Sequence, residues 1–210
     1  ILGPALIFES NSTTVVEAGW SLKVTESKSF LISKSKEKNP DLKINTSAPN
    51  PILLEIFNNS FMSIAEQMGV VLQKTAHSVN IKERLDFSCA LFDKEGSLIA
   101  NAPHIPIHLG AMSESVKAVI DAKKHFKPLD SFIHNAPYRG GTHLPDITVI
   151  TPVFIKNTSL PEFFVASRAH HADIGGITPG SMPANSNHID QEGAMFDCEE
   201  LVKNGKLLEK

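Results

Sequence analysis

The spacing of apolar and polar positions changes along the chain and divides it into three stretches. Residues 1–32 hold four short apolar runs separated by turn residues, which predicts a β-rich segment. Residues 33–50 are polar, rich in Lys and Ser, and contain two prolines, which is typical of a linker. Residues 51–210 show helical spacing first and strand-like alternation later. The pattern therefore predicts an α+β protein of mixed helices and antiparallel β-hairpins, with a short β-rich N-terminal segment.

Two stretches have the apolar spacing of amphipathic helices. The pair Asn50-Pro51 is typical of a helix start, and the spacing continues to about residues 74–77. A second helix is expected over residues 111–126. Shorter apolar runs with turn residues around them predict strands at 87–92, 97–101 and 131–135.

Two histidines precede the second predicted helix. His104 and His108 are four positions apart, but Pro106 between them argues against a helix. In an extended segment, positions four apart lie on the same face. We therefore expect both side chains to reach one site, either in the outer shell of a metal or against a substrate. Direct ligation of the metal and capping of the next helix are the alternatives.

A β-hairpin is predicted near the middle of the chain. Residues 147–155 and 163–167 are apolar runs with a segment of turn composition between them. If the last residue of the first run faces the first residue of the second, antiparallel pairing fixes every other partner. Asp146 should then lie within a residue or two of His170.

Five residues with metal-binding side chains converge at this end of the hairpin: His143, Asp146, His170, His171 and Asp173. Imidazole together with carboxylate favours zinc, manganese, iron or cobalt over calcium, which prefers oxygen ligands. Two His and one Asp with open positions are typical of a catalytic metal, whereas closed structural zinc sites mostly use Cys. The alternative is that these side chains only cap strand ends, but their convergence favours a site.

Two glycine pairs flank the same cluster. Gly140-Gly141 precedes it and Gly175-Gly176 follows it. Glycine permits tight turns and lets backbone N–H groups approach an anion or an oxyanion. We expect the four glycines, with Arg139, to contact the substrate.

Composition narrows the functional classes. The 210 residues carry a formal net charge of −3, which gives no basic surface for nucleic acid. No apolar run is long enough to cross a membrane, and nothing near Ile1 resembles a signal peptide. Cys89 and Cys198 are expected to be free thiols in a reducing cytosol, so a cytoplasmic location is predicted.

Long strings of the sequence closely resemble the hydantoinase B/5-oxoprolinase family. The strings are THLPDITVITPVF and VASRAHHADIGGITPGSMP, and the likeness extends back through HIPIHLGAM to Pro51. The family includes ATP-dependent enzymes that open 5-oxoproline or hydantoins, and subunits of acetone and acetophenone carboxylases. The resemblance therefore implies a small cyclic amide as the substrate, with ketone carboxylation as the alternative.

The resemblance also implies roles for the polar cluster. In the carboxylase relatives a His-x-x-Asp pair and a later His hold a transition metal, which here correspond to His143, Asp146 and His170. Four further residues are then expected to orient ligands or move protons as catalytic residues: His171, Asp173, His104 and His108.

The N-terminal string GPALIFESNSTTVVEAGW resembles the C-terminal end of hydantoinase A, the ATP-using partner. The likeness implies that residues 1–32 end an A-type half and that residues 51–210 begin a truncated B-type domain. The chain has no P-loop, so ATP is expected on a hydantoinase A-like domain or subunit. A homo-oligomer is also possible.

One position departs from the family pattern. The family usually has Asn-Asp-Pro-Tyr before the first glycine pair, whereas this chain has Ala136 in place of the Asp. The missing carboxylate leaves a third hypothesis open, that the chain is a folded but catalytically inactive remnant.

Overall fold

The structure is a computed structural model that describes residues 1–9, 12–35, 50–156 and 158–209. The predicted linker, 33–50, falls mostly outside the described residues, although Ser33 and Lys34 belong to a strand. The chain divides into two compact units, Ile1–Asn50 and Pro51–Lys210.

The four strands predicted in the first unit are all present. Strand β1 (Ala5–Phe8) pairs with β2 (Thr13–Val16), and β3 (Trp20–Val24) pairs with β4 (Phe30–Lys34). They form two separate two-stranded antiparallel sheets. Val16 of one sheet and Leu22 of the other are buried.

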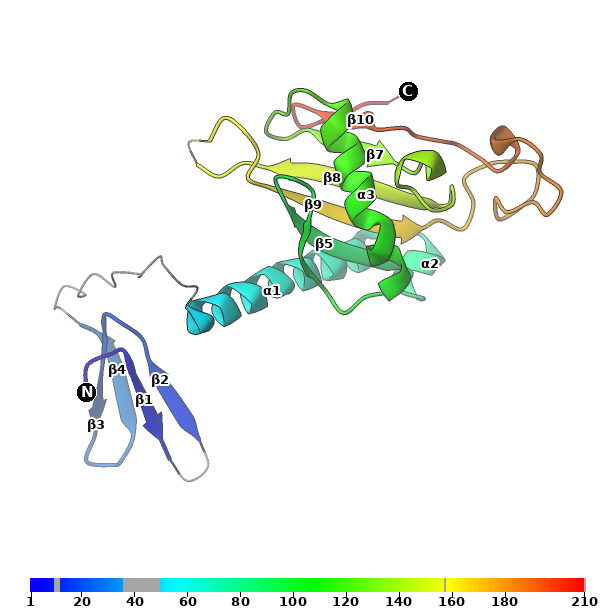
Figure 1. Cartoon of the computed structure of the whole chain (residues 1–210). Helices are drawn as coiled ribbons and strands as arrows, with labels where there is room; N and C mark the ends of the chain where they lie inside the picture. The colour runs from blue at the N-terminus through cyan, green and yellow to red at the C-terminus, as the bar shows by residue number, and fades with distance from the viewer. Residues whose placement is uncertain (10–11, 36–49, 157, 210) are drawn as a thin grey trace. The chain divides into compact units, whose positions relative to one another are not determined.

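The second unit is built on a seven-stranded antiparallel sheet, with strand order β11-β10-β7-β8-β9-β5-β6. The strands are β5 (Phe87–Asp93), β6 (Leu98–Asn101), β7 (Ser131–His134), β8 (Asp146–Val153), β9 (Phe163–His170), β10 (Glu199–Lys203) and β11 (Lys206–Leu207). The helices are α1 (Pro51–Thr75), α2 (Val79–Lys82) and α3 (Pro106–Ala122), with short 3-10 turns η1 (Pro137–Arg139) and η2 (Ile189–Gln191). Figure 1 shows α3 across one face of the sheet and α1 on the other. This arrangement confirms the α+β class.

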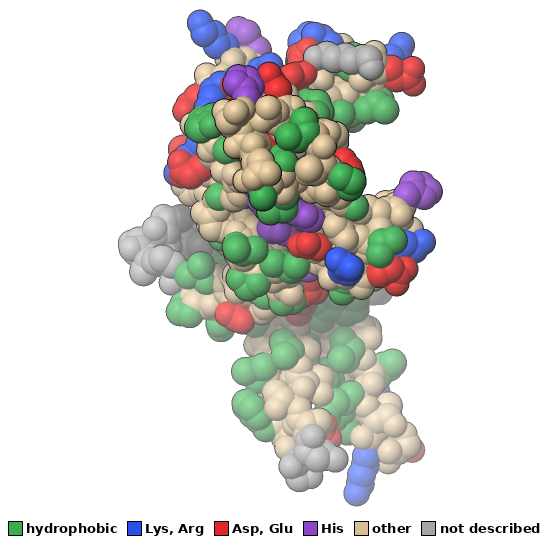
Figure 2. All heavy atoms as spheres, turned by 90° about the vertical axis from the view of Figure 1, so that its right-hand side faces the viewer, with side chains coloured by type: hydrophobic (Ala, Val, Ile, Leu, Met, Phe, Trp, Pro, Cys, Tyr) green, Lys and Arg blue, Asp and Glu red, His purple; other side chains and the backbone are tan. Residues whose placement is uncertain are grey.

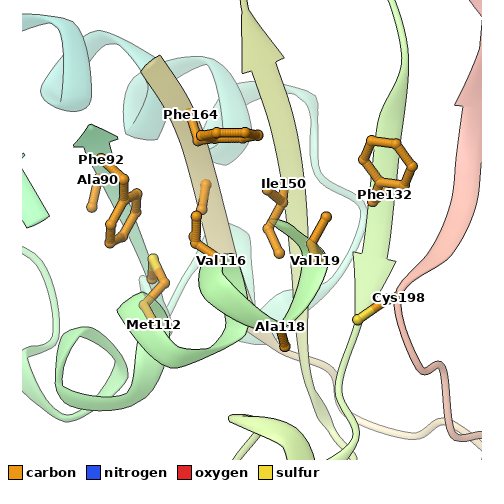
Figure 3. Packing of buried hydrophobic residues seen from close by; sticks show 11 residues of the cluster. Ala90, Phe92, Met112, Val116, Ala118, Val119, Phe132, Ile150, Phe164 and Cys198 are labelled. Atoms are coloured by element: carbon orange, nitrogen blue, oxygen red, sulfur yellow. The ribbon is translucent and has the colours of Figure 1, made fainter. Parts of the chain in front are cut away.

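Strand alternation supplies a core on each face of this sheet. On the α3 side the strands contribute Ala90, Phe92, Phe132, Ile150 and Phe164, which pack against Met112, Val116 and Val119 of the helix (Figure 3). On the α1 side the strands contribute Phe87, Cys89 and Leu91, which pack against Ala65, Met68 and Leu72. Because neighbouring strand residues point to opposite faces, one strand such as β5 serves both cores.

The expected register of the central hairpin is wrong by two residues. Val153, not Ile155, faces Phe163, and Asp146 lies directly opposite His170. Both the backbone N–H and the hydroxyl of Thr158 bind the carbonyl of Ile155, so Ile155 starts the turn instead of ending the strand. The conclusion drawn from the register, that Asp146 lies close to His170, is confirmed.

The prediction that the segment around Pro106 is extended is also wrong. Pro106 is the first residue of α3, the position where its missing N–H costs nothing. His108 therefore lies in the first helical turn on the α3 side. His104 precedes the helix and belongs to the α1 side, where its Nδ1 accepts the N–H of Cys89 (3.1 Å) and its ring meets Phe87 edge-on.

Among the described helices, none combines the length and apolar character that a bilayer crossing would need.

Candidate metal centre

The hairpin of β8 and β9 places two polar rows on the α3 side of the sheet. The outer row pairs Asp146, the first residue of β8, with His170, the last residue of β9. Two residues further inward on each strand, Thr148 pairs with Arg168. Because side chains alternate across a sheet, both rows point to the same face. The polar end of the hairpin thus continues directly into the apolar core.

His143, Asp146 and His170 bring their donor atoms together at the edge of the sheet. Asp146 Oδ1 lies 2.9 Å from His170 Nδ1, and Oδ2 lies 3.2 Å from His143 Nδ1. The two imidazoles approach each other to 3.1 Å, between His143 Nε2 and His170 Nδ1. The N–H of Asp146 donates to the His143 carbonyl and closes the turn that joins the pair.

The separations suit a shared metal ion. Two ligands that are each about 2.1 Å from one metal lie about 3 Å apart when they are adjacent around it. The two separations measured from His170 Nδ1, to Asp146 Oδ1 and to His143 Nε2, match this spacing, and one donor atom from each of the three residues lies within 4.8 Å of the others. The set of two imidazoles and one carboxylate matches sites for zinc and non-haem iron. Thr142 donates its hydroxyl to Asp146 Oδ2 (2.8 Å), which orients the buried carboxylate as outer-shell groups do. The residues present therefore fit a divalent transition metal.

His108 faces this group from the first turn of α3. Its Nε2 lies 3.8 Å from Asp146 Oδ1 and 3.5 Å from Asp86 Oδ1. The carbonyl of Asp86 accepts the N–H of His170, which ties the segment before β5 to the end of β9. Burial lowers the pKa of His108, with Asp146 and Asp86 opposing the shift, so the neutral ring is favoured. Its second nitrogen, Nδ1, is buried without a hydrogen-bond partner among the described residues.

Arg168 is the main contributor that the sequence interpretation missed. Its guanidinium is fully buried and donates to Thr148 Oγ1 (2.7 Å), Ser115 Oγ (2.6 Å) and the carbonyl of His108 (3.3 Å). It thereby connects β9, β8 and α3 directly beneath the outer row. The signal was available, because Arg168 lies two positions before His170 and must share its face, but the predicted strand ended at residue 167.

The first glycine pair has no room for side chains. Gly140 has a φ of +90°, and a Cβ there would lie 2.5 Å from the backbone carbon of Glu114. A Cβ on Gly141 would overlap the carbonyl oxygen of Asn135. The carbonyl of Gly140 accepts the Ser115 hydroxyl (2.6 Å), which fixes the loop against α3. The loop is therefore held in the conformation that delivers the chain to His143.

The other predicted site residues lie around the cluster without joining it. Arg139 donates to both carboxylate oxygens of Asp197 (2.9 and 3.1 Å). Asp173 accepts the N–H groups of Gly175 (2.8 Å) and Gly180 (3.1 Å), so it organises its own loop. His171 donates its backbone N–H to Pro145, and burial lowers the pKa of its half-buried ring.

Gly176 packs closely against the backbone at Gln191, whereas the position of a Cβ on Gly175 is open. His104 is separated from the cluster because it lies on the α1 side of the sheet, and Gly69 leaves it space: a Cβ there would lie 2.5 Å from the His104 ring. Figure 2 shows the face that lies at the right of Figure 1, where histidine side chains lie next to acidic ones.

The second unit matches a known protein family. The hydantoinase B/oxoprolinase family matches residues 50–210, so the chain belongs to that family. It is 49% identical to 5-oxoprolinase 1 of Arabidopsis thaliana and 48% identical to 5-oxoprolinase of Saccharomyces cerevisiae. Both alignments cover 100% of this chain but only 16% of the relative, so the chain corresponds to a fragment of such proteins.

Two solved structures share the fold. The nucleotide-free structure of an acetone carboxylase aligns with a TM-score of 0.69 at 23% identity, over 76% of this chain and 21% of that one. An ATP-dependent caprolactamase from Pseudomonas jessenii aligns with a TM-score of 0.67 at 28% identity, over 76% of this chain and 28% of that one.

Proposed function

We propose that this chain supplies the metal-binding part of an ATP-dependent hydrolase that opens a cyclic amide of the 5-oxoproline or hydantoin type. The observation that carries the proposal is the convergence of His143, Asp146 and His170 at one edge of the sheet. The substrate class is supported by relatives named 5-oxoprolinase and by a structural neighbour described as a caprolactamase, because each of these enzymes is named after a cyclic amide.

A divalent manganese, iron, cobalt or zinc ion on these three residues would supply Lewis acidity toward an amide carbonyl. Asp146 is buried and held by Thr142, whereas the side chain of His143 is 41% exposed. The accessible side of the cluster is therefore the side of His143, where a substrate would approach. His108 closes the opposite side with a neutral ring that is able to accept or return a proton.

Arg139, the two glycine pairs, His171 and Asp173 keep the substrate-binding and catalytic roles proposed from the sequence, whereas His104 does not, because it lies on the α1 side of the sheet. The loop of Gly140-Gly141 leads directly to His143 and is fixed against α3 by the Ser115 hydroxyl. ATP is assigned to a hydantoinase A-like domain or subunit, so this chain alone is not expected to complete a turnover. Cytoplasmic location and homo-oligomerisation stay predictions.

Ketone carboxylation is the second candidate. Its structural support is the acetone carboxylase neighbour, but at 23% identity that likeness concerns the fold alone. The remnant hypothesis rests on Ala136, which is buried at the start of η1 and accepts backbone N–H groups from Arg139 and Gly141. The carboxylate missing at position 136 therefore does not belong to the group of three proposed ligands, and hydrolysis remains our proposal.

Elemental analysis of the purified 210-residue chain tests the metal site. We expect the His143→Ala/Asp146→Ala double variant to lose one equivalent of transition metal relative to wild type. The matched control is His188→Ala, which removes an exposed histidine that is paired with Asp190 outside the cluster and should leave the metal content unchanged. Equal metal content in the wild type and the double variant, both folded, would contradict the site.

The reaction is tested by adding a hydantoinase A-like protein, ATP and 5-oxoproline and measuring glutamate. Product is expected only with both proteins, and it should be absent with the double variant. Turnover that survives the double variant would exclude a role for the cluster in catalysis.

A further inference from the structure

A second group of metal-binding side chains lies at the junction of β7 and β10. It consists of His134, the last residue of β7, with Asp197 and Cys198 just before β10. His134 and Cys198 are buried, whereas the Asp197 side chain is 40% exposed. Cys198 lies at the margin of the α3-side core, next to β7 (Figure 3). None of the three residues belongs to the candidate metal centre at Asp146.

The spacing of the three donor atoms suits a tetrahedral ion. His134 Nδ1 lies 3.5 Å from Cys198 Sγ and 3.7 Å from Asp197 Oδ1. In a tetrahedral zinc site, with bonds of about 2.0–2.1 Å to nitrogen and about 2.3 Å to sulfur, the nitrogen and sulfur lie about 3.5 Å apart. One ion between these atoms would thus lie at bonding distance from the imidazole nitrogen and the sulfur, and it would replace the backbone N–H of Cys198 as the partner of Nδ1.

The tautomer of His134 is the one that a metal ligand needs. Its Nε2 lies 3.0 Å from the carbonyl oxygen of Arg139. A carbonyl only accepts, so Nε2 carries the proton and the lone pair of Nδ1 faces Cys198 and Asp197. Histidine ligands of metals commonly donate their other ring N–H to a backbone carbonyl in this way. In the structure the Nδ1 lone pair also accepts the backbone N–H of Cys198 at 3.3 Å.

The local backbone is built to hold this geometry. Cys198 has a φ of +56°, a region that residues other than glycine seldom occupy. Asn135 fixes the facing segment, because its Oδ1 accepts the N–H of Phe196 (2.6 Å) and its amide donates to the carbonyls of Leu144 and Ala194. The thiol is therefore directed at His134 by a scaffold that does not depend on the thiol.

Arg139 already binds the carboxylate of Asp197, and this contact is compatible with an ion. Each carboxylate oxygen has two lone pairs, so Oδ1 is able to keep its hydrogen bond from Arg139 while it faces a metal. Binding would convert the Cys198 thiol into a thiolate, with its proton released to solvent and a sulfur–metal bond formed. The exposed side of Asp197 leaves a route for the ion and a fourth position for water.

We propose that His134, Asp197 and Cys198 form a second metal site, which takes zinc and links the end of β7 to the start of β10. Thiolate and imidazole ligands favour zinc and cobalt over magnesium and calcium. The alternative is that direct hydrogen bonds alone hold the three side chains together.

Cobalt substitution separates these possibilities. A cobalt–thiolate bond gives a charge-transfer absorption in the near ultraviolet, and the candidate centre at Asp146 has no sulfur ligand. We expect one such band per folded chain in wild type. The band should persist in His143→Ala/Asp146→Ala, so failure of the proposed function would leave this readout intact.

The isosteric variant Cys198→Ser should lose the band, and so should His134→Gln, which identifies the ligands even if one variant folds poorly. Cys89→Ser is the matched control, because Cys89 is the other buried thiol, and it should keep the band. Added zinc should raise the thermal midpoint of the His143→Ala/Asp146→Ala variant and should not raise it once Cys198→Ser is combined with that variant. A folded wild-type chain without the band, or a band that survives Cys198→Ser, would overturn the proposal.

Discussion

Arg168 shows, at the scale of one residue, how this domain holds a charge away from water. A buried guanidinium is costly unless its donors are satisfied. Here the partners come from three separate segments, namely Thr148 of β8, Ser115 of α3 and the loop carbonyl of Gly140. Burial lowers the pKa of Arg168 and the nearby Asp146 opposes that shift. The residue thus links the polar end of the hairpin to the helix above it.

Arg168→Ala should therefore destabilise the chain strongly. Removal of the side chain leaves a cavity and orphaned acceptors, for which we expect a loss of about 3–5 kcal/mol in the free energy of unfolding. Arg168→Lys should recover only part of the loss, because an ammonium group lacks the planar fork of donors. Urea unfolding measures both. A loss below about 1 kcal/mol for the alanine variant would contradict this account.

Asp173 gives a pH-dependent prediction. Hydrogen bonds from the N–H of Gly175, the N–H of Gly180 and the Ser181 hydroxyl lower its pKa below the ordinary 3.8. The folded state thus favours the carboxylate, and the resulting stabilisation is complete above the ordinary value and lost as the pH falls through the lowered one. Wild type should be more stable than Asp173→Asn near neutral pH, and the difference should shrink below 3.8. Urea unfolding at several pH values measures it; a difference independent of pH would contradict it.

At the scale of elements, the site depends on a loop that is pressed against a helix. The Gly140-Gly141 loop packs on the backbone of α3 at Glu114 and Ser115. The hairpin alone positions Asp146 and His170, but His143 reaches them only through this loop. The loop conformation is therefore part of the site.

Gly140→Ala tests that dependence, with Gly110→Ala as the matched control within α3. At Gly140 the φ is positive and a Cβ would overlap the Glu114 backbone. The substitution should therefore lower the free energy of unfolding by more than the roughly 1–2 kcal/mol that a left-handed alanine costs. It should also lower metal content. A Cβ on Gly110 has no atom within 4 Å, so Gly110→Ala should raise the free energy of unfolding by about 0.5–1 kcal/mol. Unfolding curves and elemental analysis compare the two, and equal effects would refute the role of the loop.

At the scale of the whole molecule, only part of the apolar surface of α1 is packed against the sheet. Its second half packs on β5 and β6 through Ala65 and Met68. Its first half exposes large apolar side chains, including Ile52, Leu54, Ile56 and Phe57. Exposed apolar patches commonly mark contact surfaces. The two 5-oxoprolinases named above are about six times as long as this chain, so the surface is available for packing against the additional segments that such proteins have.

In the 210-residue chain this surface should promote self-association. We expect sedimentation to depend on concentration, and the Ile56→Glu/Phe57→Glu variant to shift the chain toward monomer. Lys74→Glu, at the other end of α1, is the charge-matched control and should not. Association that is unchanged in the Ile56/Phe57 variant would place the contact elsewhere.

The sequence by itself determined the local periods and the polar residues that meet at the end of the central hairpin. Helical spacing after Pro51 gave α1 to within two residues, and alternation around Asp146 and His170 was sufficient to bring these two side chains together. The family followed from the long strings around His143 and His170. These features are readable because they depend on neighbours a few residues apart or on one hairpin.

Only the tertiary structure decided features that depend on distant segments. The turn at Ile155 set the register, and the start of α3 at Pro106 placed His104 and His108 on opposite sides of the sheet. The partners of Arg168 and the approach of Cys198 to His134 arise from chain segments far apart in sequence. The physical reason is that a one-dimensional period specifies which face a residue occupies, whereas packing between elements specifies what that face meets.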